Sequence, residues 1–521
     1  MTAPMLDDQV ARATRNTLGD ALARAAAHHG TRDALLFRDR HWSFVDLDRA
    51  ASHLAHHLLG LGLQPGDRVA AYGKNSDVYL MLWLACTRAG LIHVPLNFSL
   101  VERELVYALN QSGARALLFD PALADAVTAV IAQTPVAHSA PLQPMPGRSD
   151  DLLTVVKAAP ADVQPPALEQ ADTDVVQILY TSGTTSDPKG AMHTHRSLLT
   201  EYASCQIHLD IRSSDRALAA LPLYHSAQMH VFTLPTLLAG GTTWLVDDPS
   251  PANLIALLRD HRLNAFFAPP TVWIALLRHA DFDPAGLSAL TKLYYGASIM
   301  PEPIVHELAA KLPAAGLYNC YGQSEIAPLA TVLRPEDHTT RPASAGRPIQ
   351  SVVTRILHPD TGADCAPGEH GEIVHRSPQL MVGYWQNPDA TAKAFKDGWF
   401  HSGDLGYRDE QGFLFIVDRI NDVINTGGVL VASRDVEEVL YSHPQVAEVA
   451  VIGLPDERWV EAVCAVIVVK AGQQLSETEL ADHARAALAH FKVPKRWFFA
   501  EALPKNTAGK VLKRALRQQY Q

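Results

Sequence analysis

The sequence predicts an α/β protein in which a large amino-terminal domain is followed by a smaller α+β domain. Three observations predict this architecture. Strand and helix patterns alternate through residues 1–334 at the spacing of doubly wound sheets. From about Pro335 helical periodicity disappears, and short β segments alternate with turns that carry Gly, Pro and Asp. A new α+β pattern begins after Asp418, in a chain of 521 residues that is too long for one hydrophobic core.

The first alternation predicts a doubly wound subdomain over residues 1–165. We expect helices at 18–29, 43–61 and 101–111, and strands at 68–72, 91–96 and 116–119. Asn75 or Ser76 would cap one further helix, because such side chains accept hydrogen bonds from backbone N–H groups of the first turn. Residues 138–172, which are rich in Pro, Ala and Asp, are expected to cross the surface to the next subdomain.

The alternation resumes in a second doubly wound subdomain, residues 166–334, where the apolar run 175–180 predicts a buried strand. Further strands are expected at 216–221, 242–246, 265–268 and 292–295, and helices at 230–238, 251–260 and 272–279. Residues 335–418 predict a small β-barrel, with strands near 352–357, 371–376 and 413–417. The C-terminal domain, 419–521, should contain helices at 433–442 and 477–489 and strands at 446–451 and 462–469.

Composition and charge limit the function classes. Hydrophobic residues make up 47% of the chain and charged residues 19%, which predicts a globular protein. The net charge of −11 argues against nucleic-acid or anionic-membrane binding, because either needs a basic surface. Five cysteines without a CxxC pair are typical of a reducing compartment. There is no apolar signal segment, and the most apolar run, 78–87, is too short for a bilayer, so a cytoplasmic protein is expected.

The stretch Tyr180–Gly190 combines hydroxylic residues, two glycines and Lys189 directly after a predicted strand. Exposed backbone N–H groups, hydroxyls and a mobile positive charge suit phosphate oxygens. An ordinary Ser/Thr/Gly turn is the alternative interpretation of this stretch alone. A Walker A loop would need Gly before the lysine, and Pro188 stands there, so a P-loop NTPase is disfavoured.

Further stretches follow in a fixed order: Tyr321–Glu325 (YGQSE), Trp399–Asp404 (WFHSGD), Asp418–Asp422 (DRIND), Gly427-Gly428, and Pro504–Lys510 (PKNTAGK). With these motifs the chain resembles the adenylate-forming (ANL) superfamily of acyl-CoA synthetases, non-ribosomal adenylation domains and beetle luciferases. The resemblance covers essentially the whole chain. It implies a mobile C-terminal domain and the substrates ATP and coenzyme A, with Mg²⁺ as the metal. It also implies a two-step reaction, in which a carboxylate and ATP form an acyl-adenylate and pyrophosphate before a thiol displaces AMP.

The resemblance also implies a set of residues for the phosphates and the first step. It implies that Thr181, Ser182, Gly183, Thr184 and Lys189 hold the β- and γ-phosphates. Glu325 matches the Mg²⁺-binding carboxylate, and Ser324 replaces the family's usual Thr while keeping a hydroxyl for the α-phosphate. Lys510 matches the catalytic lysine that bridges the carboxylate and the α-phosphate. A lone lysine in a basic tail is otherwise solvated charge.

For the nucleoside, Asp404 and Arg419 match the ribose contacts, with a surface salt bridge as the alternative. The segment Gly296-Ala297-Ser298 matches the one whose backbone lies along adenine, and Tyr318–Tyr321, with Gly322 next to it, should form the other wall. Asp418 matches the hinge between the domains. Two departures from the family pattern are Asn421, where Lys is common, and the apolar Val429-Leu430-Val431.

Apart from its reacting carboxylate, the acid substrate is expected to carry no charged group. Amino-acid-activating relatives place an Asp within the segment here written Leu221–His230, and this segment has no acidic residue. His225 matches a residue that closes over the acyl carbonyl, although it could be a packed core histidine. The predicted pocket residues are otherwise apolar or small: Met229, Trp273, Tyr295 and Gly296. This favours a medium-chain or branched fatty acid, with an aryl acid as the alternative.

Other functions were weighed against the CoA ligase. An acyl-AMP ligase that loads a carrier-protein thiol fits the same motifs, whereas a nucleotide-binding regulatory module is poorly supported because Lys510, Glu325 and Asp404 are all present. A homodimer is left open. His193 and His195 have metal-ligand spacing but no third ligand, so they are interpreted as polar loop residues.

Overall fold

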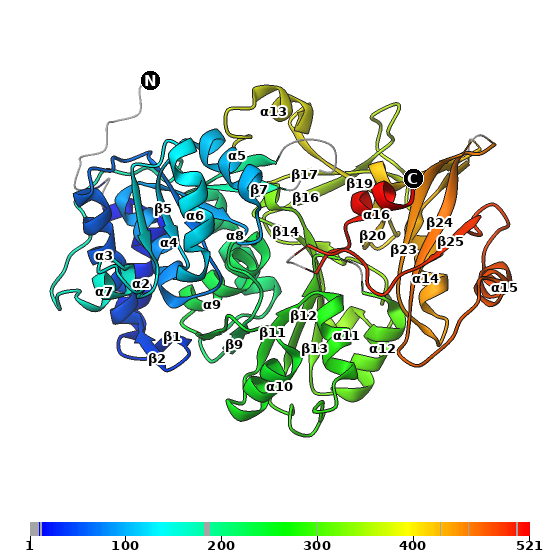
Figure 1. The fold of residues 1–521 in the computed structure, drawn as a ribbon, viewed down its shortest axis with the longest axis horizontal. Helices are drawn as coiled ribbons and strands as arrows, with labels where there is room; N and C mark the ends of the chain where they lie inside the picture. Colours follow the sequence, from blue (N-terminus) through cyan, green and yellow to red (C-terminus); the bar gives the residue numbers. More distant parts are fainter. Residues whose placement is uncertain are drawn as a thin grey trace.

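The computed structural model of the chain describes residues 10, 13–181, 188–298, 300–427, 429–456, 458–506 and 509–521. Its strands form four sheets, of six, nine, five and five strands (Figure 1). The last sheet belongs to a small C-terminal domain, drawn in orange to red in Figure 1, that lies beside the larger part of the molecule. This mixed α/β architecture confirms the predicted fold class.

The six-stranded sheet has the order β6-β5-β3-β4-β7-β8. All of its pairs are parallel except β7–β8, which is antiparallel. Its strands are β3 (Arg68–Tyr72), β4 (Ile92–Leu96), β5 (Ala114–Phe119), β6 (His138–Pro141), β7 (Val175–Thr181) and β8 (Lys189–Thr194). The associated helices are α2 (Leu18–His29), α3 (Phe44–Gly60), α4 (Asp77–Ala89), α5 (Glu102–Ser112), α6 (Ala124–Val130), α7 (Leu152–Lys157) and α8 (His195–His208).

Helix α4 is the centre of this subdomain, because all of its residues are buried and it contacts α2, α3 and α7. Ser76 caps it, with the hydroxyl accepting a hydrogen bond from the backbone N–H of Tyr79 at 3.1 Å. Its apolar side chains therefore pack in protein on every side. No helix within the described ranges is long and apolar enough to cross a membrane.

The nine-stranded sheet has the order β15-β14-β13-β12-β11-β9-β10-β1-β2, with a parallel centre from β13 to β1. Its strands are β1 (Asp33–Phe37), β2 (Arg40–Ser43), β9 (Arg216–Ala219), β10 (Thr242–Leu245), β11 (Ala265–Ala268), β12 (Lys292–Gly296), β13 (Gly316–Gly322), β14 (Leu329–Leu333) and β15 (Arg347–Pro348). The helices are α9 (Leu234–Leu238), α10 (Pro251–Asp260), α11 (Pro270–Arg278) and α12 (Glu302–Lys311). A π-helix, η3 (Ala227–Thr233), precedes α9, so the helix expected at 230–238 starts earlier and is wider at its beginning.

The third sheet is antiparallel and is centred on β19, which pairs with β17, β18 and β20. Its strands are β16 (Val353–Leu357), β17 (Gly371–Arg376), β18 (Phe395–Lys396), β19 (Trp399–Arg408) and β20 (Leu414–Arg419), with α13 (Pro388–Ala394) beside them. This is the region expected to form a β-barrel. Among the described residues no strand pair joins β16 to β20, so the pairing does not close.

The C-terminal domain packs helices against an antiparallel sheet with one parallel edge strand, β25. Its strands are β21 (Ile424–Thr426), β22 (Val429–Val431), β23 (Val446–Asp456), β24 (Val460–Val469) and β25 (Arg496–Phe499). Its helices are α14 (Ser433–Tyr441), α15 (Glu477–Ala487) and α16 (Lys513–Tyr520). Residues Ala462–Val468 of β24 are buried on both faces of the sheet, which explains their continuous apolar sequence.

Strand pairing cuts across the boundary expected between residues 165 and 166. Strands β7 and β8 complete the first sheet, whereas β1 and β2 pair at the edge of the second. The stretch expected to be a surface crossing contains β6 and α7, with Leu152, Leu153 and Val156 buried. His193 lies on β8 and His195 begins α8, and both are fully buried, so the interpretation as loop residues was wrong. The division into domains itself stays a prediction.

Candidate active site

The candidate nucleotide site lies where β12 and β13 end and where β19 and β20 approach them. Two predicted glycines are required by close packing. A Cβ on Gly296 would lie 2.2 Å from the Cys320 carbonyl oxygen, and one on Gly322 would lie 1.8 Å from that of Pro328. Ala297, in the segment expected along adenine, has a φ of +63°, which is strained for a residue with a side chain. Ser298 follows it and is half-buried.

Asp404 and Arg419 face each other across the β19–β20 pair. Arg419 donates from Nε to Asp404 Oδ1 at 2.6 Å, while Tyr321 Oη and Gln323 Nε2 each donate to Oδ2 at 2.7 Å. Asp404 is 4% exposed, which does not fit the alternative of a surface salt bridge. Its Oδ1 has one donor, so this oxygen retains an acceptor position for an incoming hydroxyl. The sequence did not indicate Gln323.

The Tyr384 side chain links two predicted phosphate-side residues. Its hydroxyl donates to Glu325 Oε1 at 2.9 Å, and the Lys189 ammonium lies 5.4 Å from the centre of its ring. Tyr384 therefore holds a carboxylate and a cation next to one another. Of the other predicted phosphate residues, Thr181 ends β7, and its hydroxyl lies 3.4 Å from the Lys189 carbonyl. Ser182, Gly183 and Thr184 lie outside the described residues.

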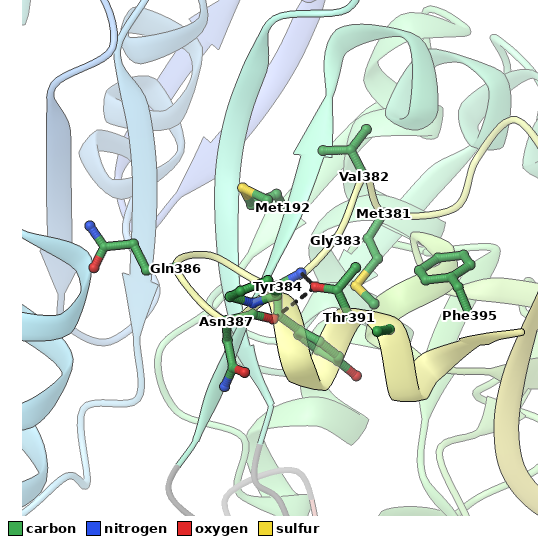
Figure 2. Close-up of a pocket in the computed structure, with 11 residues that line it drawn as sticks. Met192, Met381, Val382, Gly383, Tyr384, Gln386, Asn387, Thr391 and Phe395 are labelled. Atoms are coloured by element: carbon green, nitrogen blue, oxygen red, sulfur yellow. Dashed lines mark hydrogen bonds between the residues drawn. The ribbon is translucent and has the colours of Figure 1, made fainter.

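An apolar cavity of about 680 Å³ lies beside Tyr384. Its lining residues include Met192, Met381, Val382 and Phe395 (Figure 2). The backbone N–H of Tyr384 donates to Thr391 Oγ1 at 2.9 Å, which ties the cavity wall to α13. None of the residues predicted for the acid pocket lines this cavity.

Ser324 lies next to Ser226, which follows His225 in the chain and directly precedes η3. Ser324 Oγ is 2.9 Å from Ser226 Oγ, and the Ser324 carbonyl is 2.7 Å from His193 Nε2. These contacts fix the turn that carries both Ser324 and Glu325. Burial, together with the positive charge of Lys510, lowers the pKa of His225 to about 4, so its imidazole is neutral at pH 7.

Lys510 reaches this site from the C-terminal domain. The preceding Gly509 has a φ of +79° and packs on the start of α11, where a Cβ would lie 2.5 Å from Thr271 Oγ1. Lys510 is exposed to solvent. Protein atoms nevertheless surround it closely, and this desolvation, together with Arg419, lowers its pKa, while Asp404 and Asp422 oppose the shift. The arrangement brings Lys510 together with His225, Asp404 and Arg419.

Asp418 lies near the end of β20, the last strand of the third sheet along the chain, shortly before the first strand of the C-terminal sheet. Its Oδ2 accepts hydrogen bonds from both the backbone N–H and the hydroxyl of Ser433, each at 2.7 Å. Ser433 is the first residue of α14, so these bonds join Asp418 to the C-terminal domain. In this arrangement the expected hinge residue is held by a polar contact.

Three residues predicted for the acid pocket pack in the hydrophobic core instead. Trp273 is 0% exposed and donates from Nε1 to the Tyr294 carbonyl at 3.1 Å. Tyr295 is also buried, with its hydroxyl 3.0 Å from His338 Nε2, and Met229 packs in the first subdomain, where Gln177 contacts its sulfur. Ala227, from the segment Leu221–His230, and Cys320, from the expected adenine wall Tyr318–Tyr321, are only partly buried and border the core cluster that contains Val231 and Phe232.

Comparisons with known proteins agree with this geometry. The family model described as "AMP-binding enzyme" matches residues 22–385, and "AMP-binding enzyme C-terminal domain" matches residues 435–510. A feruloyl-CoA synthase from Amycolatopsis sp is 38% identical over 480 residues, which cover 92% of this chain and 94% of that protein. The fatty acid–[acyl-carrier-protein] ligase ScoC from Streptomyces coeruleorubidus is 35% identical over 512 residues, covering 97% of this chain and 96% of its own length.

Among solved structures, ATP-bound MatB from Rhodopseudomonas palustris superposes with a TM-score of 0.89 at 29% identity, covering 96% of this chain and 99% of that chain. The apo form of the same protein covers the same shares at the same identity, with a TM-score of 0.78. This chain therefore superposes better on the ATP-bound structure of MatB than on its apo structure.

Substitution of Trp273 tests its assignment to the core. Trp273→Ala is expected to lower the free energy of unfolding by about 3–5 kcal/mol, because it leaves a large cavity and removes the hydrogen bond to the Tyr294 carbonyl. Urea unfolding of the full chain measures this loss, and Trp273→Phe, which keeps most of the volume, should lose clearly less. Unchanged stability of Trp273→Ala would show that the ring lines an open pocket.

Proposed function

This chain belongs to the AMP-binding enzyme family. On this premise we propose that it joins a carboxylic acid, whose remaining part is apolar and uncharged, to the thiol of CoA. The enzyme is an acid–thiol ligase that uses ATP to activate its acid. The single observation that carries the residue assignment is the position of Lys510, which lies with His225, Asp404 and Arg419 although it belongs to another domain.

The first step joins two anions, so the site has to offset their repulsion. A carboxylate oxygen bonds to the α-phosphorus while the bond to the bridging oxygen of the β-phosphate breaks, and pyrophosphate leaves. We assign Lys510 to the charge that develops between carboxylate and α-phosphate, and Lys189 to the leaving pyrophosphate. The neutral His225 would border the carbonyl side of the acid without adding charge. In the second step the thiol bonds to the acyl carbon, AMP leaves, and the thiol proton is released.

The proposed nucleotide contacts follow from the fixed carboxylate of Asp404. Its hydrogen bonds to Tyr321, Gln323 and Arg419 orient it before ATP arrives, so a ribose hydroxyl would meet an acceptor that needs no reorganisation. The Gly296–Ser298 turn and the end of β13 would flank adenine. The close packing of Gly296 and the strain at Ala297 support a backbone surface built for a flat ligand.

Glu325 fits a Mg²⁺ ion shared with the phosphates. No cluster of three or more His, Cys, Asp or Glu side chains suited to a metal occurs in the described ranges. Mg²⁺ commonly takes one or two carboxylates and completes its shell with phosphate oxygens and water. Since Tyr384 binds Oε1, Glu325 Oε2 would be the ligand. The ion would neutralise phosphate charge, and Tyr384 would hold the carboxylate for it.

The proposed acid lies near His225, Ala227 and Cys320. The absence of an acidic residue from Leu221 to His230 leaves no partner for a substrate ammonium, and the partly buried surface there is apolar or neutral. Within this class, a medium-chain or branched aliphatic acid remains our proposal. An aryl acid is the second candidate, supported by the relative that is named feruloyl-CoA synthase.

The relative named as a carrier-protein ligase supports a second acceptor, the thiol of a carrier protein. The acceptor can be tested separately from the acid, since only the second step of the reaction involves the thiol. We propose CoA as the acceptor, because a relative that is 38% identical to this chain is named feruloyl-CoA synthase.

Tyr384→Phe tests the proposed metal contact. This change removes the hydrogen bond to Glu325 and keeps the aromatic ring near Lys189, so we expect a 10- to 100-fold higher Mg²⁺ requirement, as for other residues that orient metal ligands. The measurement is acid-dependent pyrophosphate release across a Mg²⁺ titration. Glu325→Gln should raise the Mg²⁺ requirement more than Tyr384→Phe does. An unchanged Mg²⁺ dependence in both variants would refute the assignment of Glu325 as a metal ligand.

The lowered pKa of Lys510 predicts a pH dependence. The ammonium is present below its pKa and is lost as the pH rises through it, so kcat/KM for ATP should fall at a lower pH than an ordinary lysine would cause. Lys510→Arg should remove this alkaline decline, since a guanidinium stays charged. Lys510→Ala should lower kcat/KM by about 10²–10³-fold at pH 7. If Lys510→Arg shows the same alkaline decline in kcat/KM, the decline belongs to the titration of another group.

A substrate panel tests the proposed activity. We expect pyrophosphate release with octanoate, a branched aliphatic acid or a hydroxycinnamate, and a thioester only after a thiol is added. The controls are an α-amino acid and a dicarboxylate, which should give no release above background. CoA and a phosphopantetheinylated carrier protein are compared as acceptors. Activity with only the two control acids would contradict an apolar, uncharged pocket.

A further inference from the structure

Lys513 lies three residues after the proposed catalytic lysine, at the first position of α16. Its ammonium donates to Glu437 Oε1 at 2.8 Å and to Ser433 Oγ at 2.5 Å. The same Ser433 hydroxyl donates to Asp418 Oδ2 at 2.7 Å. A continuous polar chain therefore runs from the helix that follows Lys510 to Asp418.

Two members of this chain are buried and two are half-buried. Ser433 is 0% exposed and Asp418 is 8% exposed, and the side chains of Lys513 and Glu437 are 18% and 22% exposed. Burial alone would lower the pKa of Lys513, but the carboxylates of Glu437 and Asp418 raise it above its usual value. Lys513 is therefore charged at neutral pH and has partners on both sides. Such a group fixes the relative position of the elements that it joins.

Two lysine ion pairs hold the segment around Lys510, one on each side of it, and we call them anchors. They connect the segment to different elements. Lys505 and Val511 form an antiparallel bridge, and the backbone N–H of Lys510 donates to Asn506 Oδ1 at 2.9 Å. On one side Lys505 pairs with Glu448 of β23 at 2.7 Å, inside the C-terminal domain. On the other side Lys513 reaches α14 and Asp418. Of these two anchors, that of Lys513 connects the segment to Asp418, through Ser433.

We propose that Lys513 is a positioning residue that holds Lys510 in the active site by fixing α16 to Ser433 and Asp418. This inference rests on the proposed role of Lys510 in adenylation and extends it to a residue that does not touch the substrates. Arg517, one turn further along α16, pairs with Asp422 at 2.7 Å and strengthens the same connection. An error of about 1 Å in the position of a reacting group can cost roughly 100-fold in rate. Loss of this anchor therefore acts on kcat of adenylation.

The test uses the full-length enzyme with three variants. Lys513→Met removes the charge and leaves the half-buried Glu437 without its partner, which also lowers stability. The double variant Lys513→Met/Glu437→Met removes both charges, so no unpaired carboxylate remains. It still lacks the contact of residue 513 with Ser433. Lys505→Met is the matched control, since it removes an ion pair of the same type on the other side of Lys510.

Two rates are measured for each variant: acid-dependent pyrophosphate release, and CoA thioester formation from supplied acyl-adenylate. Lys513→Met and the double variant should lose about 10- to 100-fold in kcat for pyrophosphate release with KM for ATP within about twofold of wild type. Thioester formation from the adenylate should stay within about threefold. Lys505→Met should resemble wild type in both rates, and Lys513→Arg should recover part of the adenylation rate.

Two outcomes would overturn the inference. Equal losses in Lys505→Met and Lys513→Met would mean that both anchors of the segment matter equally, and that the contact of Lys513 with Ser433 has no special role. Full recovery of adenylation in the double variant would mean that Lys513 acts through stability alone. If Lys513→Met does not fold, the double variant carries the test. Failure of the proposed function has a different signature, because wild-type enzyme would then release no pyrophosphate with any acid of the panel.

Discussion

The site depends on the contact that brings Lys510 from one domain into a cleft built by another. Gly509, which directly precedes Lys510 and has a positive φ, packs against Pro269 and Thr271 at the start of α11. Without this contact the cleft has acceptors for ribose and a carboxylate for a metal, but no cation opposite His225. The interface between the domains is therefore a part of the candidate active site itself.

The remaining charges are paired before any substrate binds. Arg419 is bonded to Asp404, and Glu325 and Lys189 are both held by Tyr384. Such pairing keeps each charged group oriented in a partly buried site, where an isolated charge would be costly. Lys510 differs from these groups, because burial lowers its pKa and none of the described carboxylates forms an ion pair with it in the structure. An incoming anion would supply the missing partner, which fits a residue that acts only when the acid and ATP are both present.

The sequence predicted the fold class and most elements, since periodicity and capping are local signals; α10 and β3, for example, have the expected bounds. It could not predict which face a residue presents, so Trp273, Tyr295 and Met229 were expected in the acid pocket although they pack in the core. Contacts that join distant segments were also out of reach. Tyr384 lies 59 residues from Glu325, and Gln323 lies 81 residues from Asp404. The pairing of β1 with β10 was missed for the same reason.

A disulfide across the domain interface tests the central claim that this arrangement is the one that forms the adenylate. The Cβ of Thr271 lies 3.8 Å from the position of a Cβ on Gly509, which matches the usual separation in disulfides. The variant Thr271→Cys/Gly509→Cys is assayed for acid-dependent pyrophosphate release in its oxidised and reduced forms, and the reduced form controls for strain at residue 509. The account predicts that the oxidised enzyme releases the first equivalent of pyrophosphate as fast as the reduced enzyme. Loss of that release on oxidation, restored by reduction, would contradict it.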